Sequence, residues 1–77
     1  MTDAEKIAAA RELLSNPLTE LLLTDLEMSA VNACVNAPVK DHEARAAHAA
    51  EVRAVRSFRG KLKALTSEAN PQRKTPA

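Results

Sequence analysis

Residues 36–41, Asn-Ala-Pro-Val-Lys-Asp, form the one clear turn in the sequence and decide the expected fold. Pro38 cannot continue a helix, and Asp41 can cap the next helix, which would begin at His42. Alanine, leucine, glutamate, arginine and lysine dominate both flanking segments, and all of them favour helix. Two helices joined by so short a connection lie antiparallel to one another. The sequence therefore predicts a helical hairpin.

The two arms of this hairpin are expected over residues 17–36 and 42–68. Asn16 is a suitable N-cap, and Pro17 suits the first helical position after it. A continuous helix kinked at Pro17 is the alternative. In the second arm, Gly60 costs up to about 1 kcal/mol relative to alanine, so it is a candidate for a close contact. At 1.5 Å per residue the arms would be about 30 and 40 Å long.

The two ends of the chain complete the expected architecture. Thr2 and Glu5 have the spacing of a capping box, which predicts a short first helix over residues 3–15. Residues 70–77 have no apolar periodicity and are expected to be a disordered polar tail. We therefore expect a single all-α domain over residues 1–69. It is an elongated antiparallel helical hairpin with a short N-terminal helix folded on one end, and it is expected to be oligomeric.

Composition excludes several classes of protein. The chain has 77 residues, one cysteine (Cys34), one glycine and one aromatic residue (Phe58). An intrachain disulfide, a cysteine-rich zinc site, a Rossmann turn and a P-loop are therefore not available. The N-terminus lacks a signal-peptide pattern, and no apolar run approaches the roughly 18 residues of a membrane span. A soluble intracellular protein without a membrane partner is expected.

Charge is divided unevenly between the two halves of the chain. Residues 1–39 hold two basic and six acidic side chains, a net charge of −4, and residues 40–77 hold nine basic and four acidic ones, a net charge of +5. Such a division indicates that the halves pair with one another or that the basic half meets an anionic partner.

The arm over residues 17–36 has two apolar stripes at helical spacing. Leu22, Leu26, Ala30 and Ala33 form one, widened by Leu23 and Cys34, and a hairpin partner can cover only one stripe. The other stripe, which contains Leu21, Met28 and Val35, must contact the first helix, a second subunit or a foreign protein. On the third helix the apolar spacing follows a coiled-coil-like seam. The expected protein interface consists of Leu21, Met28, Val31, Val35, Val55, Phe58, Leu62 and Leu65.

A basic stripe lies beside this seam and has competing interpretations. Its members are Arg45, Arg53, Arg56, Arg59 and Lys63. Glu20, Asp25 and Glu27 are expected to face positions 50–57 of a hairpin, so these acids could pair with Arg53 and Arg56. Alternatively, the row of arginines could bind nucleic acid through phosphates, although stacking aromatics are lacking. Binding to an acidic protein surface is the third possibility.

The sequence contains no constellation that predicts catalysis. His48 and Glu51 lie three residues apart, but carboxylate-bridged metal bundles place glutamate before histidine and use two such sets. A satisfied polar pair is expected there. We therefore predict no catalytic residues, no metal, no cofactor, no small-molecule substrate and no enzymatic activity.

One overall pattern suggests a family. The run Leu13-Leu14-Ser15-Asn16-Pro17-Leu18, followed after a turn by Arg53, Arg56, Phe58, Arg59, Leu62 and Leu65, resembles small helical proteins encoded among the head and packaging genes of tailed bacteriophages. The resemblance implies a non-enzymatic protein–protein interaction module that acts as a structural or assembly accessory of the virion, associated with capsid, portal or packaging machinery. Its partners would be itself as a homo-oligomer, a larger phage structural protein, or both. Its location would be the cytoplasm of an infected bacterium, the virion, or both.

Two alternatives to this assembly role stay open. One is a small nucleic-acid-binding accessory protein that uses the basic stripe of the third helix. The other is a regulator of a host protein, which the sequence does not separate from the assembly role.

Overall fold

A computed structural model describes residues 1–68 of the chain, and these form three α-helices. They are α1 (Asp3–Ser15), α2 (Pro17–Asn36) and α3 (His42–Glu68), and the described residues contain no strand. The predicted all-α fold is therefore confirmed, and the helices have the expected bounds. The tail expected over residues 70–77 lies outside the described residues.

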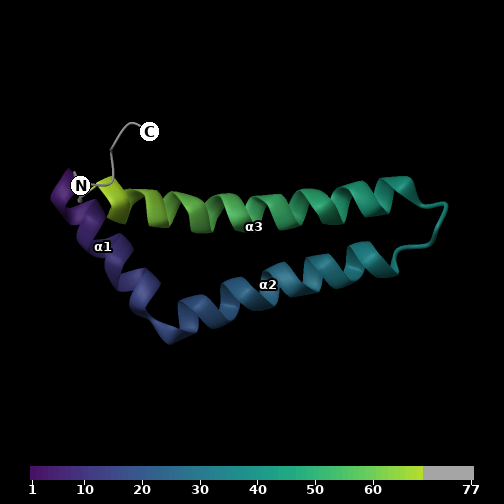
Figure 1. Cartoon of the computed structure of the whole chain (residues 1–77), viewed down its shortest axis with the longest axis horizontal. Coiled ribbons are helices and arrows are strands. Elements are labelled where there is room, and N and C mark those ends of the chain that lie inside the picture. Colours follow the sequence, from purple (N-terminus) through teal and green to yellow (C-terminus); the bar gives the residue numbers. More distant parts are fainter. Residues whose placement is uncertain (69–77) are drawn as a thin grey trace, which may run out of the picture.

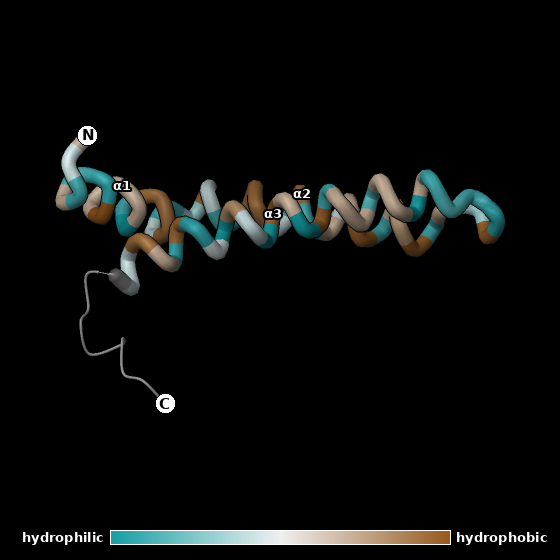
Figure 2. Tube along the Cα trace, turned by 90° about the horizontal axis from the view of Figure 1, so that it is seen from above, coloured by the Kyte–Doolittle hydropathy of each residue, from teal (hydrophilic) through white to brown (hydrophobic). Residues whose placement is uncertain are grey.

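The chain folds into an elongated triangle. Helices α2 and α3 run antiparallel as a hairpin, while α1 crosses the open end between the start of α2 and the end of α3 (Figure 1). Apolar residues recur along the whole length of the hairpin instead of gathering at one end (Figure 2). This distribution matters because a two-helix arm has only one inner side on which to bury them.

Local hydrogen bonds explain where the first two helices begin. The Oγ1 atom of Thr2 accepts a hydrogen bond from the Glu5 amide at 3.1 Å, and Glu5 Oε1 accepts one from the Thr2 amide at 2.8 Å. The hydrogen bond from the Thr2 amide to the Glu5 carboxylate is the largest cause of a lowered pKa at Glu5. Asn16 is extended, and its Oδ1 accepts from the Leu18 amide at 2.9 Å. The chain therefore breaks at Asn16 into two helices, and the alternative of one kinked helix is excluded.

Hydrogen bonds made by Asp41 and Arg45 stabilise the turn between α2 and α3. Asp41 Oδ1 accepts from the Ala44 amide at 3.0 Å, which caps the start of α3, and the Asp41 amide donates to the Pro38 carbonyl at 2.9 Å. The Arg45 guanidinium reaches back from α3 and donates to the carbonyls of Pro38 and Val39 at 3.1 and 2.7 Å. Arg45 thus supplies donors to carbonyls of the turn itself, beyond the end of α2, and ties the turn to the first residues of α3.

The core of this single chain is small. Among the described residues its buried apolar members are Ala10, Leu23, Ala30, Val52 and Leu62. Ala10 of α1 is only 2% exposed, so its short side chain allows α1 to approach the hairpin closely. On α3 the inner side follows Val52 and Leu62, and Phe58 is 51% exposed. The expected seam through Phe58 is therefore displaced around the helix.

Candidate protein-binding surface

Large apolar side chains cover much of the outer surface of α2. Six of them are about half exposed or more, and only Leu23 among the leucines of this helix is buried. The six are Leu18, Leu21, Leu22, Leu26, Met28 and Val35. A helix that is apolar around most of its circumference normally contacts neighbours on more than one side. In this chain α2 has one long neighbour, α3.

The exposed residues of α2 fall into two groups on either side of its buried line. Leu23 and Ala30 form that line against α3, with Cys34 half-buried after them. At 100° per residue, Leu18, Leu22 and Leu26 lie to one side of the line, and Leu21, Met28 and Val35 lie to the other. The first group was missed as a surface, because sequence periodicity alone assigned Leu22 and Leu26 to the same stripe as Ala30.

The residues predicted for a protein interface occupy three environments. Leu21, Met28, Val35 and Phe58 are exposed by 57%, 49%, 76% and 51%, respectively. Val31, Val55 and Leu65 are half-buried, so each has one edge open to solvent. Leu62 is only 6% exposed. It belongs to the chain's own core, and its assignment to a partner interface is corrected, because a side chain already buried within the chain has almost no surface left for a partner.

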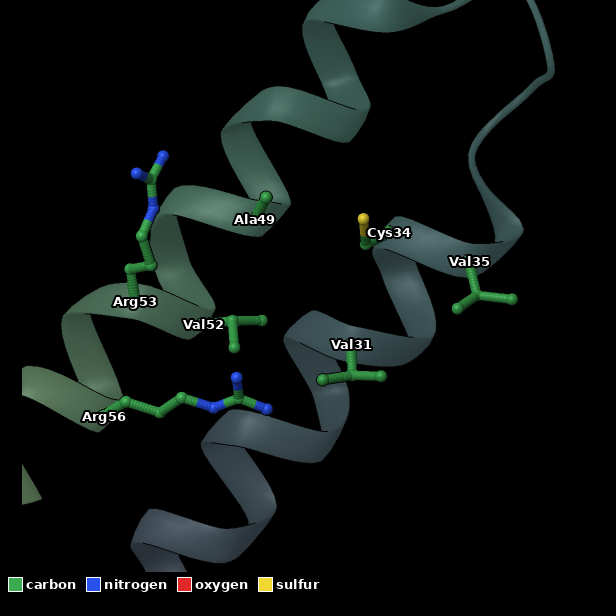
Figure 3. A pocket seen from close by; sticks show the side chains of 7 residues that line it. All are labelled: Val31, Cys34, Val35, Ala49, Val52, Arg53 and Arg56. Carbon is green, nitrogen blue, oxygen red and sulfur yellow. The ribbon is translucent and has the colours of Figure 1, made fainter.

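A groove of about 350 Å³ runs between α2 and α3 near the turn. Val31, Cys34 and Val35 line it from α2, and Ala49, Val52, Arg53 and Arg56 line it from α3. In Figure 3 the Arg56 side chain reaches across toward α2, whereas the Arg53 side chain extends away from it. The floor is apolar and one rim is cationic, a combination that suits a partner with apolar and acidic side chains.

Two ion pairs join the acidic α2 to the basic α3. Arg56 Nε lies 3.1 Å from Glu27 Oε2, and an Arg59 guanidinium nitrogen lies 2.6 Å from both carboxylate oxygens of Glu20. The hydrogen bond from Arg59 is the largest cause of a lowered pKa at Glu20. The expected pairing of Glu27 with Arg56 is therefore present, and Glu20 pairs with Arg59, which lies further along α3 than the expected positions 50–57.

These contacts occupy most of the predicted anion-binding stripe. Arg56 and Arg59 are engaged by glutamates and Arg45 by the carbonyls of the turn. Arg53 and Lys63 are exposed and form no ion pair with another described side chain. Three of the five cations therefore already have partners within the chain, and Arg53 and Lys63 are the members of the stripe without an ion pair among the described residues.

His48, Glu51 and Cys34 are the polar groups for which the sequence predicted no catalytic or metal-binding role. His48 Nδ1 is 2.9 Å from Glu51 Oε1, so the pair satisfies itself on the surface of α3. Cys34 is half-buried, with its Sγ 3.6 Å from the carbonyl oxygen of Arg45. No group of three histidine, cysteine, aspartate or glutamate side chains within residues 1–68 is arranged to hold a metal ion.

Comparison with known proteins gives no relative for this chain: no protein-family model, no curated protein and no solved structure matches it. Among the described helices, none combines the length and the apolar character that crossing a membrane requires. The function must therefore be inferred from the surface itself.

Proposed function

We propose that this chain is a non-enzymatic protein–protein interaction module whose apolar α2 surface binds protein. The observation that supports the proposal is the exposure of six large apolar side chains on one 20-residue helix. Burying apolar surface contributes about 25 cal/mol per Å² removed from water, which favours association over a free monomer. The partner is a second copy of the chain, a larger structural protein, or both.

The shape of the molecule supports this role. An elongated hairpin offers two long sides, and each carries leucine, methionine or valine side chains from α2. Both ion pairs between the arms are made within the chain, so the hairpin is pinned together without a partner and can present its surfaces ready-formed. A preformed surface binds with a smaller loss of conformational entropy than a segment that must fold on its partner.

Sedimentation velocity across micromolar concentrations tests self-association. We expect an assembly that grows with concentration and is lost in the Leu21→Ser/Met28→Ser variant, because both of these side chains are exposed on this surface. The matched control is Thr24→Ser/Ser29→Ala, which alters exposed α2 positions of little apolar area. A wild-type monomer at every concentration, with no binding to a structural protein, would contradict the proposal.

The setting proposed for this module is the assembly of a tailed-phage particle, on the family resemblance of the Asn16-Pro17 start and the arginine-leucine third helix. Capsid, portal or packaging proteins would then be the larger partners, in an infected bacterial cell or in the virion. The gene neighbourhood tests this setting directly. Capsid and terminase genes beside this one are expected, and a neighbourhood of unrelated host genes would contradict the phage role while leaving the interaction module intact.

A further inference from the structure

Two stripes on the same side of the hairpin have matching spacing. On α2 the exposed residues Leu21, Met28 and Val35 recur every seven positions, and on α3 Ala46, Arg53 and Gly60 do the same. Val35 and Arg53 line one groove, so both stripes belong to its side of the molecule (Figure 3). Seven-residue spacing keeps side chains on one face of a packed helix, so each stripe is continuous.

The ion pairs fix how the two stripes align along the hairpin. Glu20 is level with Arg59 and Glu27 is level with Arg56. Because the helices are antiparallel, the α2 stripe is then level with the α3 stripe, residue for residue to within about one helical turn. The level pairs are Leu21 with Gly60, Met28 with Arg53, and Val35 with Ala46.

The α3 stripe has room for a neighbour. A Cβ atom built on Gly60 would meet nothing within 4 Å. Ala46, Arg53 and Ala64 are exposed as well, so α1 leaves this side of α3 open from one end to the other. A glycine inside a long helix lowers its stability by up to about 1 kcal/mol, and no other side chain within residues 1–68 fills the space beside this one. A leucine from another molecule could lie over Gly60.

Charge complements this fit. Residues 17–36 hold Glu20, Asp25 and Glu27 and no basic residue, whereas residues 42–67 hold six basic and two acidic residues. Glu20 and Glu27 are paired within the chain. Asp25, which lies next to Leu21 at the edge of the α2 stripe, and Arg53 are exposed and form no ion pair with another described side chain. Each molecule thus offers an unused acid on α2 and an unused base on α3.

We propose that the partner of this surface is a second copy of the chain, related by a two-fold axis parallel to the long axis of the hairpin; this rests on the proposed function. The axis places α2 of each copy on α3 of the other, with Leu21 over Gly60 and Val35 over Ala46. Met28 packs on the alkyl stem of Arg53, whose guanidinium pairs with Asp25. Stacking α2 on α2 would instead place the two unpaired Asp25 carboxylates on the same interface and leave both Arg53 side chains without an acid, which disfavours that arrangement.

Charge reversal tests this geometry in the full-length chain. Asp25→Lys and Arg53→Glu should each raise the dimer dissociation constant roughly tenfold at low ionic strength, because each places like charges together twice in a two-fold dimer. An equimolar mixture of the two variants should regain a dissociation constant within about twofold of wild type. In the mixed dimer the introduced lysine faces the introduced glutamate at one contact, and the unchanged Arg53 faces the unchanged Asp25 at the other. Both contacts are then attractive, so only a contact between copies gives this rescue.

A bulky residue at Gly60 provides a second, independent measurement. Gly60→Leu should abolish the dimer, because it fills the space that Leu21 of the other copy requires. Ala54→Leu is the matched control, since Ala54 is exposed on α3 but lies outside the stripe. Circular dichroism should show undiminished helix in both variants, as leucine is a better helix former than glycine and nearly as good a one as alanine.

The outcomes separate this inference from the proposed function. A dimer that is rescued on mixing and lost in Gly60→Leu supports the arrangement. A wild-type dimer that neither reversal weakens, or that mixing does not restore, overturns the arrangement but keeps an interaction module. The control pair Glu12→Lys and Lys61→Glu changes the same charges away from the stripes, and a matching response from it would also overturn the inference. A wild-type monomer at all concentrations overturns it together with self-association.

Discussion

Arg59 of α3 holds Glu20 of α2, with both carboxylate oxygens 2.6 Å from one guanidinium nitrogen, although 39 residues separate the two in the sequence. The Arg59 side chain is only 17% exposed and occupies the inner side of α3, while Glu20 stays at the surface. The pair therefore fixes the register of the hairpin at its open end, where α1 packs.

This pair predicts an acid-dependent loss of stability. The hydrogen bond from Arg59 lowers the pKa of Glu20 below its ordinary value of 4.5, so the folded state favours the ionised carboxylate. The stabilisation is present above the unfolded pKa and is lost as the pH falls through the lowered folded pKa. Glu20→Gln should therefore lose less stability than wild type between about pH 7 and about pH 3.

Urea unfolding at the two pH values, followed by circular dichroism, measures this difference. Glu12→Gln is the control, because Glu12 is exposed on α1 and forms no ion pair with another described side chain. An equal acid sensitivity in wild type and Glu20→Gln would show that the pair does not contribute.

Two adjacent leucines should differ sharply in their effect on folding. Leu23 is 7% exposed and Leu22 is 51% exposed. Leu23→Ala should cost about 2–4 kcal/mol, because it removes buried area and leaves a cavity, and in so small a core this can unfold the chain. Leu22→Ala should cost less than about 1 kcal/mol. Urea unfolding of the monomer checks the ratio, and equal costs would contradict the inward side assigned to α2.

Gly60→Ala should stabilise the monomer. The backbone at Gly60 is helical without positive φ, and an added Cβ meets no atom within 4 Å. Alanine should therefore raise the free energy of unfolding by up to about 1 kcal/mol, through its better helix propensity. Thermal unfolding at a concentration below that of any assembly measures it. A destabilised Gly60→Ala monomer would mean that α3 meets a neighbour within the chain at this position.

Arg45 should stabilise the turn more than its surface position suggests. Its guanidinium donates to the carbonyls of Pro38 and Val39, which follow α2. Arg45→Met should cost roughly 1 kcal/mol, since it removes charge-assisted hydrogen bonds at a partly exposed site while keeping the alkyl stem. Lys40→Met is the control within the same turn, at an exposed position. Urea unfolding distinguishes the two, and equal losses would assign the effect to charge alone.

Short-range signals explain why the helix bounds could be predicted. The Thr2–Glu5 capping box, the Asn16-Pro17 start and the Asp41 cap each depend on hydrogen bonds within about one helical turn. Such contacts form wherever the local residues allow them, and they need no information about the rest of the fold. The exposure of apolar side chains on α2 was also predictable, because α2 is apolar on more sides than one neighbouring helix can cover.

The inward side of each helix could not be predicted in the same way. In α2 the leucines at positions 21, 22 and 23 are equally apolar, so periodicity does not determine which of them faces α3. Arg59 was not assigned to the seam of α3, whereas Phe58 was, because apolar character outweighed charge in the pattern. Val52 was missed because the spacing through Phe58 leads back to Glu51 instead. Only the pairing of Arg59 with Glu20 shows why an arginine takes an inner position and Phe58 remains half exposed.

By itself, the sequence determined that residues 1–68 form three helices with a turn at residues 36–41, because caps, proline and helix propensity act over a few residues. The tertiary structure alone decided which apolar side chains are covered, since a rotation of one helix by a single position exchanges Leu22 for Leu23. That rotation depends on contacts between residues far apart in the chain, namely the packing of the buried side chains and the ion pairs between α2 and α3. It leaves Leu21, Met28 and Val35 on the outside, beside a glycine with open space above it.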